Sequence, residues 1–200
     1  MALLQAADAG DLERMRRLID RGARANAVLD GDGSPLIAAA RSGQLEAMAM
    51  LIQAGADVNR GVGGDGSPLI MAAQRGHLEA VRMLLDHGAD IDAGVPGDGN
   101  ALIMAAGEGQ LEVVRFLLEK GAALEKVVPG DENALIHASE GGQAEVVRFL
   151  LGKGADVNAL AWADAGPHGG KGEWRTALLM ARRNGHADVV RILQAAGARE

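Results

Sequence analysis

Several features are missing from this 200-residue chain, and each absence excludes a class of protein. There is no cysteine, which rules out disulfides and thiolate metal sites but leaves the redox compartment undecided. No run of 18 apolar residues occurs, and residues 1–15 lack a basic segment followed by a long apolar one. We therefore expect neither a transmembrane helix nor a signal peptide, no membrane contact by this chain, and a cytoplasmic location.

Positive charge is also in short supply. The chain has 20 lysines and arginines against 27 aspartates and glutamates, and the two signs are interspersed along it. A phosphate backbone would find no basic patch on such a surface, so nucleic acid is not expected as a partner.

Glycine, in contrast, is abundant and periodic, with two columns that repeat every 33 residues and reach a sixth unit after a step of 43. The columns are Gly10, Gly43, Gly76, Gly109, Gly142 and Gly185, and Gly22, Gly55, Gly88, Gly121, Gly154 and Gly197. A fixed period of this length indicates a repeat architecture. The sequence predicts one domain over residues 1–200, with units at about 1–27, 28–60, 61–93, 94–126, 127–159 and 160–200. The last unit carries a ten-residue insertion.

Each unit has the pattern of two short antiparallel helices. In SPLIMAAQRGHLEAVRMLLDHGADI, residues 67–91, apolar residues recur at helical spacing on both sides of Gly76. Ser67 is a predicted N-cap with Pro68 at the first helical position, and each glycine column falls where a helix stops. A leucine column (Leu36, Leu69, Leu102, Leu135, Leu178) and an alanine column (Ala39, Ala72, Ala105, Ala138, Ala181) predict a core that forms only when the units stack.

This pattern resembles the ankyrin repeat, whose units read as a TPLHxAA turn and helix, a GH break, a VVxLLL helix and a GADVN loop. GADVN itself stands at residues 55–59 and 154–158. The resemblance implies an all-α ankyrin-repeat solenoid of stacked helix-turn-helix units joined by short turns or fingers. One steady departure is that Ile37, Ile70, Ile103, Ile136 and Leu179 replace the usual turn histidine. A more apolar turn is therefore expected.

Polar residues interrupt the apolar columns in the first and last units. Arg14 and Arg17 stand where later second helices have apolar residues. In the last unit, Arg182 interrupts a column of small residues in the first helices, and Gln194 interrupts an apolar column in the second helices. Terminal repeats can present such a polar outer face to water. We expect an array that is closed at both ends, although it can still belong to a longer polypeptide.

No constellation typical of catalysis or of metal binding is recognised in the sequence, so no enzyme activity, cofactor or metal is expected. His77 and His186 occupy the GH position, which elsewhere holds glutamine, and they are interpreted as loop braces. His137 falls in a methionine column and is interpreted as a satisfied, partly buried histidine.

Four aspartates recur at the turn tips, and a calcium ladder is one hypothesis for them. They are Asp32, Asp65, Asp98 and Asp131. Packed helices of neighbouring units lie about 10 Å apart, whereas calcium needs six to eight oxygens at about 2.3 to 2.6 Å. Turn-forming aspartate beside glycine is the preferred interpretation.

The second helices carry arginines three residues after an acidic residue, which predicts a solvated, self-neutralised outer face. The arginines are Arg82, Arg115, Arg148 and Arg191. Phe116 and Phe149, again 33 residues apart, are expected in the core.

By the resemblance, partners are expected at the turn tips and on the concave face formed by the ends of the first helices. The corresponding pairs are Arg41 with Ser42, Gln74 with Arg75, Gly107 with Glu108, Glu140 with Gly141, and Arg183 with Asn184. This strip is basic, then acidic, then basic again, an order that would set register and on-rate for a partner of complementary charge.

The insertion lengthens the last finger, residues 159–177, and holds both tryptophans of the chain. Trp162, His168, Lys171 and Trp174 are therefore candidate partner contacts, since long loops and tryptophan are common at binding sites. Alternatively, one or both rings fold back onto the array. Trp174 is expected to be the more structural and Trp162 the better binding candidate.

The resulting hypothesis is a non-catalytic, monomeric scaffold that binds a protein or peptide partner. An alternative is a regulatory or sensor segment of a larger multidomain protein. The GDG-[SN]-[PA]-LI turn suggests this, because it resembles ankyrin tails of some bacterial membrane metallopeptidase-type sensor proteins. Self-association through the tryptophan finger is a third possibility.

Overall fold

The computed structural model describes residues 2–28, 33–128, 132–163 and 172–199. Within these ranges, twelve helices form six antiparallel pairs, each with a first helix of seven residues and a second of nine. The first helices are α1 (Ala2–Asp8), α3 (Pro35–Arg41), α5 (Pro68–Gln74), α7 (Ala101–Gly107), α9 (Ala134–Glu140) and α11 (Ala177–Arg183). The second helices are α2 (Leu12–Asp20), α4 (Leu45–Gln53), α6 (Leu78–Asp86), α8 (Leu111–Glu119), α10 (Ala144–Gly152) and α12 (Ala187–Ala195).

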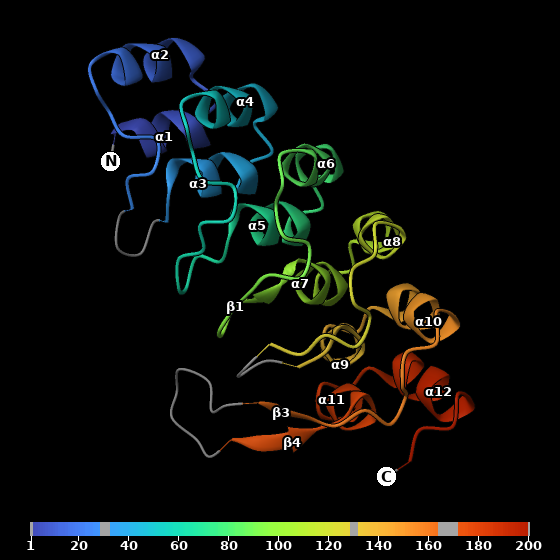
Figure 1. Ribbon diagram of the computed structural model, residues 1–200. Coiled ribbons are helices and arrows are strands. Elements are labelled where there is room, and N and C mark those ends of the chain that lie inside the picture. Colours follow the sequence, from blue (N-terminus) through green and yellow to red (C-terminus); the bar gives the residue numbers. More distant parts are fainter. Residues whose placement is uncertain (1, 29–32, 129–131, 164–171, 200) are drawn as a thin grey trace.

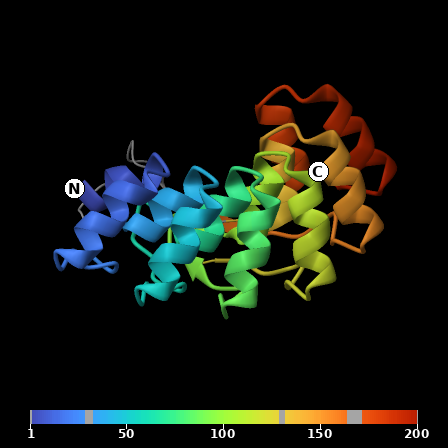
Figure 2. The same cartoon turned by 90° about the horizontal axis from the view of Figure 1, so that it is seen from above.

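The pairs stack side by side into a curved array (Figure 1). The second helices lie along the outer, convex side, and the first helices and the turns between units lie along the inner, concave side. Figure 2 shows the pairs following one another in chain order, with the C-terminal pairs turned relative to the N-terminal ones. Each first helix packs against the first helices before and after it, so the array is a solenoid.

The first helices begin at the predicted caps. Ser67 Oγ accepts a hydrogen bond from Ile70 N at 3.3 Å, and Pro68 occupies the first helical turn. Asn100 and Asn133 do the same with Oδ1 at 2.9 Å, and Thr176 caps α11. These side chains satisfy backbone donors that have no partner within the helix. Both glycine columns adopt positive φ, for example 75° at Gly76 and 85° at Gly88, which ends each helix without a Cβ clash.

The core runs through the whole array as the two columns predict. All five alanines of the alanine column are fully buried, and the five leucines of the leucine column are at most 3% exposed. The isoleucines that replace the turn histidine are buried as well, which confirms the more apolar turn. Leu179 is the exception at 39% exposure, because it belongs to the last pair and is packed from one side only.

Two short antiparallel hairpins occur in the turns, and the sequence does not predict them. Strand β1 (Gly94–Val95) pairs with β2 (Gly99–Asn100), and β3 (Ala161–Ala163) pairs with β4 (Glu173–Arg175). They do not alter the fold class, because they are finger tips on an otherwise helical array. The all-α solenoid is confirmed.

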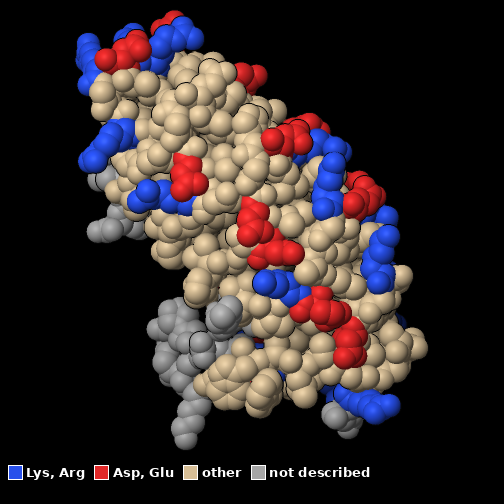
Figure 3. Space-filling model, viewed as in Figure 1, with Lys and Arg blue, Asp and Glu red and all other residues tan. Residues whose placement is uncertain are grey.

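The outer face is built from alternating charges, as Figure 3 shows along the second helices. Arg82 and Arg115 pair with the preceding Glu79 and Glu112 at 3.3 and 3.9 Å, as the spacing predicts. The same arginines also cover the phenylalanines of the next pair, with the guanidinium carbon 4.2 Å from the Phe116 ring centre and 4.3 Å from that of Phe149. These cation–π contacts tie neighbouring second helices together.

The polar residues that interrupt the apolar columns in the first and last pairs, Arg14, Arg17, Arg182 and Gln194, are exposed. In the part of the chain that the structure describes, no helix is both long enough and apolar enough to cross a bilayer.

Candidate functional site

The N-terminal end of the predicted concave strip is held by contacts between units. Asp8 of α1 accepts a hydrogen bond from Ser42 Oγ at 2.7 Å and pairs with Arg41 at 3.5 Å. The side chains of Arg41 and Ser42 therefore already contact the preceding unit, and Asp8 fixes their positions.

The middle of the strip is more open. Arg75 and Glu108 are exposed at the ends of α5 and α7. Gln74 Nε2 donates to Glu108 Oε1 at 3.4 Å, which links neighbouring units across the face. These residues change the surface charge from positive to negative over one repeat.

A pocket of about 440 Å³ opens on the concave face where α7 and α9 end. It is lined by Gly107, Glu108, His137, Glu140, Gly141 and Gln143. Gly107 and Gly141 leave room there because neither has a side chain. Earlier units carry larger residues in the same two columns, namely Arg41 and Gln74 in the first and Ser42 and Arg75 in the second. A Cβ on Gly107 would collide with the His137 ring, and a Cβ on Gly141 would collide with the Gly107 carbonyl oxygen.

Beside the pocket, a network of charged residues joins the fifth and sixth units. Glu132 is at its centre, with its side chain only 4% exposed. Arg175 Nη1 donates to Glu132 Oε1 at 2.6 Å, and His137 Nδ1 lies 3.1 Å from Glu132 Oε2. Arg175 also donates to Glu173 Oε1 at 3.0 Å, and Arg183 donates to both oxygens of Glu173. The buried carboxylate thus has partners at both oxygens.

The network shifts the pKa values of its glutamates in opposite directions. Burial alone would raise the pKa of Glu132, but the hydrogen bonds from His137 and Arg175 outweigh it and lower that pKa. Burial and repulsion by Glu132 raise the pKa of Glu140. The hydrogen bond from Arg183, with that from Arg175, lowers the pKa of Glu173 to about 2.

The sequence analysis does not identify Glu132, Glu173 or Arg175 as site residues. For two of them, however, the repeat period contains a signal. In the first three fingers the column reads Gly33, Gly66 and Gly99, with φ of 72°, 66° and 64°. The next two members are Glu132 and Arg175, two opposite charges in adjacent units. The described residues contain no positive-φ residue other than glycine, so both positions have a backbone that accepts a side chain.

The two tryptophans form a pair on the finger hairpin. Trp162 in β3 lies opposite Trp174 in β4, and their rings make an edge-to-face contact with centroids 5.5 Å apart. Directly opposed residues of an antiparallel ladder project to the same face, so the rings pack on each other. Trp174 is 60% exposed and Trp162 is 44% exposed, so both rings present surface to solvent. Which of the two is the better binding candidate stays a prediction. His168 and Lys171 lie outside the described residues.

The histidines of the GH position act as braces, as predicted. His77 Nε2 lies 3.1 Å from the Arg41 carbonyl oxygen, and His186 Nε2 lies 2.9 Å from that of Glu140. Gln110 and Gln143 make the equivalent bond in their units. Each brace joins a unit to the end of the preceding first helix. His137 is partly buried and bonded to Glu132, which agrees with its interpretation as a satisfied histidine.

One member of the aspartate column at the turn tips, Asp98, also joins two units. Asp98 N donates to Val95 O within its own turn at 2.8 Å, as a turn-forming aspartate should. Its Oδ2 accepts from Gly64 N and Gly66 N of the preceding finger, at 2.7 and 3.3 Å. The carboxylate of Asp98 is thus occupied by backbone donors. Asp32 and Asp131 lie outside the described residues.

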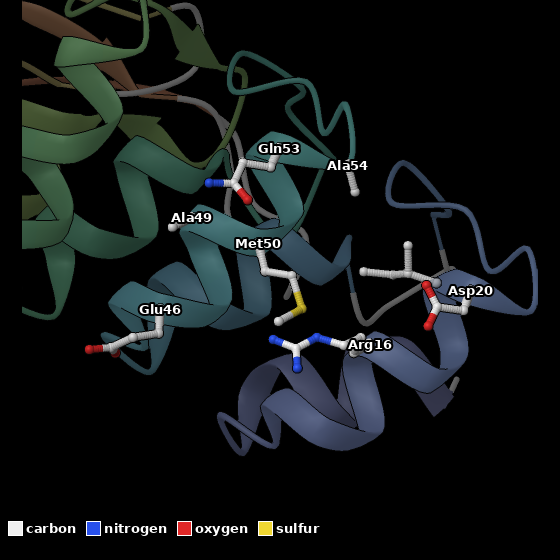
Figure 4. Close-up of a pocket in the computed structure, with 8 residues that line it drawn as sticks. Arg16, Asp20, Glu46, Ala49, Met50, Gln53 and Ala54 are labelled. Atoms are coloured by element: carbon white, nitrogen blue, oxygen red, sulfur yellow. The ribbon is translucent and has the colours of Figure 1, made fainter.

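A second hollow, of about 510 Å³, lies between α2 and α4, away from the concave strip. Figure 4 shows Arg16 of α2 pointing toward Met50 of α4, with Asp20 and Glu46 at the margins. Ala49 lines it in the column that elsewhere holds arginine, so its short side chain leaves this groove open.

Known protein families and solved structures with the same repeat architecture match this chain. A family model described as ankyrin repeats (3 copies) matches residues 3–95 and 69–161, and one described as ankyrin repeats (many copies) matches residues 135–194. The crystal structure of the human ASB11 ankyrin repeat domain is similar to all of this chain and 85% of that chain, with a TM-score of 0.79 and 26% sequence identity. Comparison with curated proteins gives no match. In total 507 solved chains match, so the fold is common and does not by itself select a partner.

Proposed function

Because this chain belongs to the ankyrin-repeat family, we propose that it is a non-catalytic scaffold that binds a protein or peptide on its concave face. Ankyrin repeats are in general protein–protein interaction modules. The finer proposal is that the partner contacts the strip from Arg41 to Asn184 and the tryptophan finger.

The observation that carries this proposal is the pocketed middle of the strip. Arg75 and Glu108 are exposed at the ends of α5 and α7 and do not contribute to the core. The hollow beside Glu108 is lined by Gly107, Gly141 and Glu140. A partner side chain can enter a concave site of this kind, while the flanking charges set its register. The exposed Trp162 and Trp174 supply the large amphipathic surface that binding sites favour.

The test is a charge exchange on the strip. We expect the double variant Arg75→Glu, Glu108→Lys to keep the net charge, circular dichroism spectrum and melting temperature of the parent chain. It should lose at least tenfold in affinity for a partner that the parent chain captures and that mass spectrometry identifies.

The matched control is the same exchange on the convex face, Arg148→Glu with Glu145→Lys, which should leave capture unchanged. If the strip variant binds the identified partner as well as the control does, the proposed surface is wrong. A variant with both tryptophans changed to alanine tests the finger in the same assay.

Two alternatives make different predictions. As a regulatory or sensor segment of a larger protein, the chain would be encoded in one open reading frame with a catalytic domain, which the full gene sequence decides. Self-association through the tryptophan finger predicts a mass by light scattering that rises with concentration and falls back to the monomer in the double tryptophan variant.

A further inference from the structure

The concave pocket has three potential metal ligands at one edge. Glu132 lies just before α9, and His137 and Glu140 project from that helix at a spacing of three residues, which places them on one face. We propose that Glu132, His137 and Glu140 form a zinc-binding site. This proposal does not depend on the identity of a protein partner.

The distances between the three ligand atoms suit a single small cation. His137 Nδ1 lies 3.1 Å from Glu132 Oε2 and 4.0 Å from Glu140 Oε2, and all three ligand atoms lie within 4.8 Å of one another. A point equidistant from atoms so spaced is about 2.4 Å or less from each, and zinc bonds to nitrogen and oxygen measure about 2.0 to 2.2 Å. A small rotation of the half-buried Glu140 closes the difference.

The buried ligand is already oriented. Arg175 holds Oε1 of Glu132 at 2.6 Å, so that Oε2 faces His137. Hydrogen bonds of this kind to the second oxygen of a carboxylate are typical of the residues that surround metal ligands. Glu132 therefore loses little side-chain freedom when an ion binds.

Space and access are provided by the pocket. Because Gly107 has no side chain, the His137 ring can lie against the end of α7, where any Cβ would displace it. His137 and Glu140 line the 440 Å³ hollow, so an ion held by three protein ligands would have its fourth position open to water.

The charge of the surroundings also favours a divalent cation. With a neutral histidine, the three glutamates and two arginines of the network carry one net negative charge, and Glu108 on the pocket rim adds another. One imidazole nitrogen with two carboxylate oxygens suits zinc, whereas magnesium and calcium favour oxygen ligands alone.

Equilibrium dialysis of the untagged, chelator-treated chain against zinc chloride tests the site. We expect one zinc ion per chain at micromolar free zinc and a rise in melting temperature on binding. His137→Met should weaken binding at least tenfold and still fold, because Met71, Met104 and Met180 occupy the same column. The matched control is His186→Gln, which should bind zinc like the parent chain.

A second variant keeps all three ligands and moves only one of them. Gly107→Ala should displace the His137 ring and weaken zinc binding, while circular dichroism stays unchanged because alanine suits a helix. The proposal is overturned if the parent chain takes up no zinc, if His137→Met binds it undiminished, or if His186→Gln loses as much affinity as His137→Met.

Discussion

At the scale of single residues, the braces between units depend on one nitrogen. His186 Nε2 meets the carbonyl oxygen of Glu140, and Gln143 Nε2 donates to the carbonyl oxygen of Gly107. Imidazole and carboxamide are interchangeable here because each can place an N–H donor against the carbonyl oxygen at the end of the preceding first helix. The rest of the side chain matters less than the position of that donor.

We therefore expect His186→Gln to leave the free energy of unfolding nearly unchanged, and His186→Ala to lower it by about 1 kcal/mol. Alanine leaves the partly buried Glu140 carbonyl oxygen without its protein donor. Urea denaturation followed by circular dichroism measures both. Equal stability of the alanine and glutamine variants would contradict the brace.

The ion pairs of Glu173 predict a dependence of stability on pH. Arg183 and Arg175 lower its pKa to about 2 from the ordinary 4.5, so the folded chain holds the ionised form more firmly than the unfolded chain does. Their stabilising effect is full above pH 4.5 and is lost as pH falls toward 2. The difference in melting temperature between the parent chain and Glu173→Gln should shrink over that interval. A difference that is constant from pH 7 to 3 would contradict the assignment.

A residue can be predicted from the sequence where it repeats in a column, but not where its role depends on a contact between unlike residues. Columns of identical residues are visible as a period, so the glycines, alanines and GH braces are assigned from sequence. Glu132 and Arg175 differ from each other and from the glycines of their column, and their contact depends on the spacing of neighbouring fingers. The sequence marks both positions as unusual but does not show that they meet.

At the scale of elements, the first helices are only seven residues long and depend on their caps. So short a helix is not stable alone, and its N-terminal donors need a partner from outside the helix. The cap column accepts serine, asparagine or threonine, because each offers a side-chain oxygen that accepts a hydrogen bond from the backbone N–H three residues later.

Ser67→Ala should therefore lower the free energy of unfolding by about 1 kcal/mol, whereas Ser67→Asn should be tolerated. Asparagine occupies the same position at Asn100 and Asn133, and its Oδ1 accepts the same bond. Thermal denaturation of the three chains provides the comparison. If the asparagine variant is as unstable as the alanine variant, the loss does not come from the cap.

Helix positions are predictable here because their caps and apolar spacing are local signals. The finger hairpins are harder, because β1 and β2 have two residues each and β3 and β4 have three, too few to show alternation. The opposition of Trp162 and Trp174 follows from the register of β3 and β4, which the sequence does not fix.

At the scale of the whole molecule, helix packing is between neighbours only. Helix α7 packs against α5, α8 and α9, and no pair of helices from distant units makes substantial contact among the described residues. Stability then behaves as a sum of units and interfaces, so a fault in the middle weakens two interfaces at once.

Ala105→Leu places a larger side chain at a fully buried position in α7 and should lower the free energy of unfolding by about 1 to 3 kcal/mol. The matched control, Ala187→Leu, adds the same volume at an exposed position in α12 and should be nearly neutral. Chemical denaturation of both variants decides the point. Equal midpoints for the two would show that the alanine column does not set the helix spacing.

The order and class of the units could be predicted from the period, because stacking follows directly from repeated apolar faces. The identity of a partner could not, since it depends on a few side chains such as Arg75, Glu108 and Trp162 that differ from unit to unit. Any of these can change without altering the columns that build the fold.

The brace that joins the third, fourth, fifth and sixth units to a carbonyl oxygen of the unit before has an evolutionary consequence. An interior unit carries a donor for its predecessor and a carbonyl for its successor, so a duplicated copy would arrive with both halves of the joints it needs. The array can lengthen by gene duplication without new contacts being invented. The joint between Glu132 and Arg175 is different, because it is made of two unlike side chains, and it fixes the last unit in its place in the order.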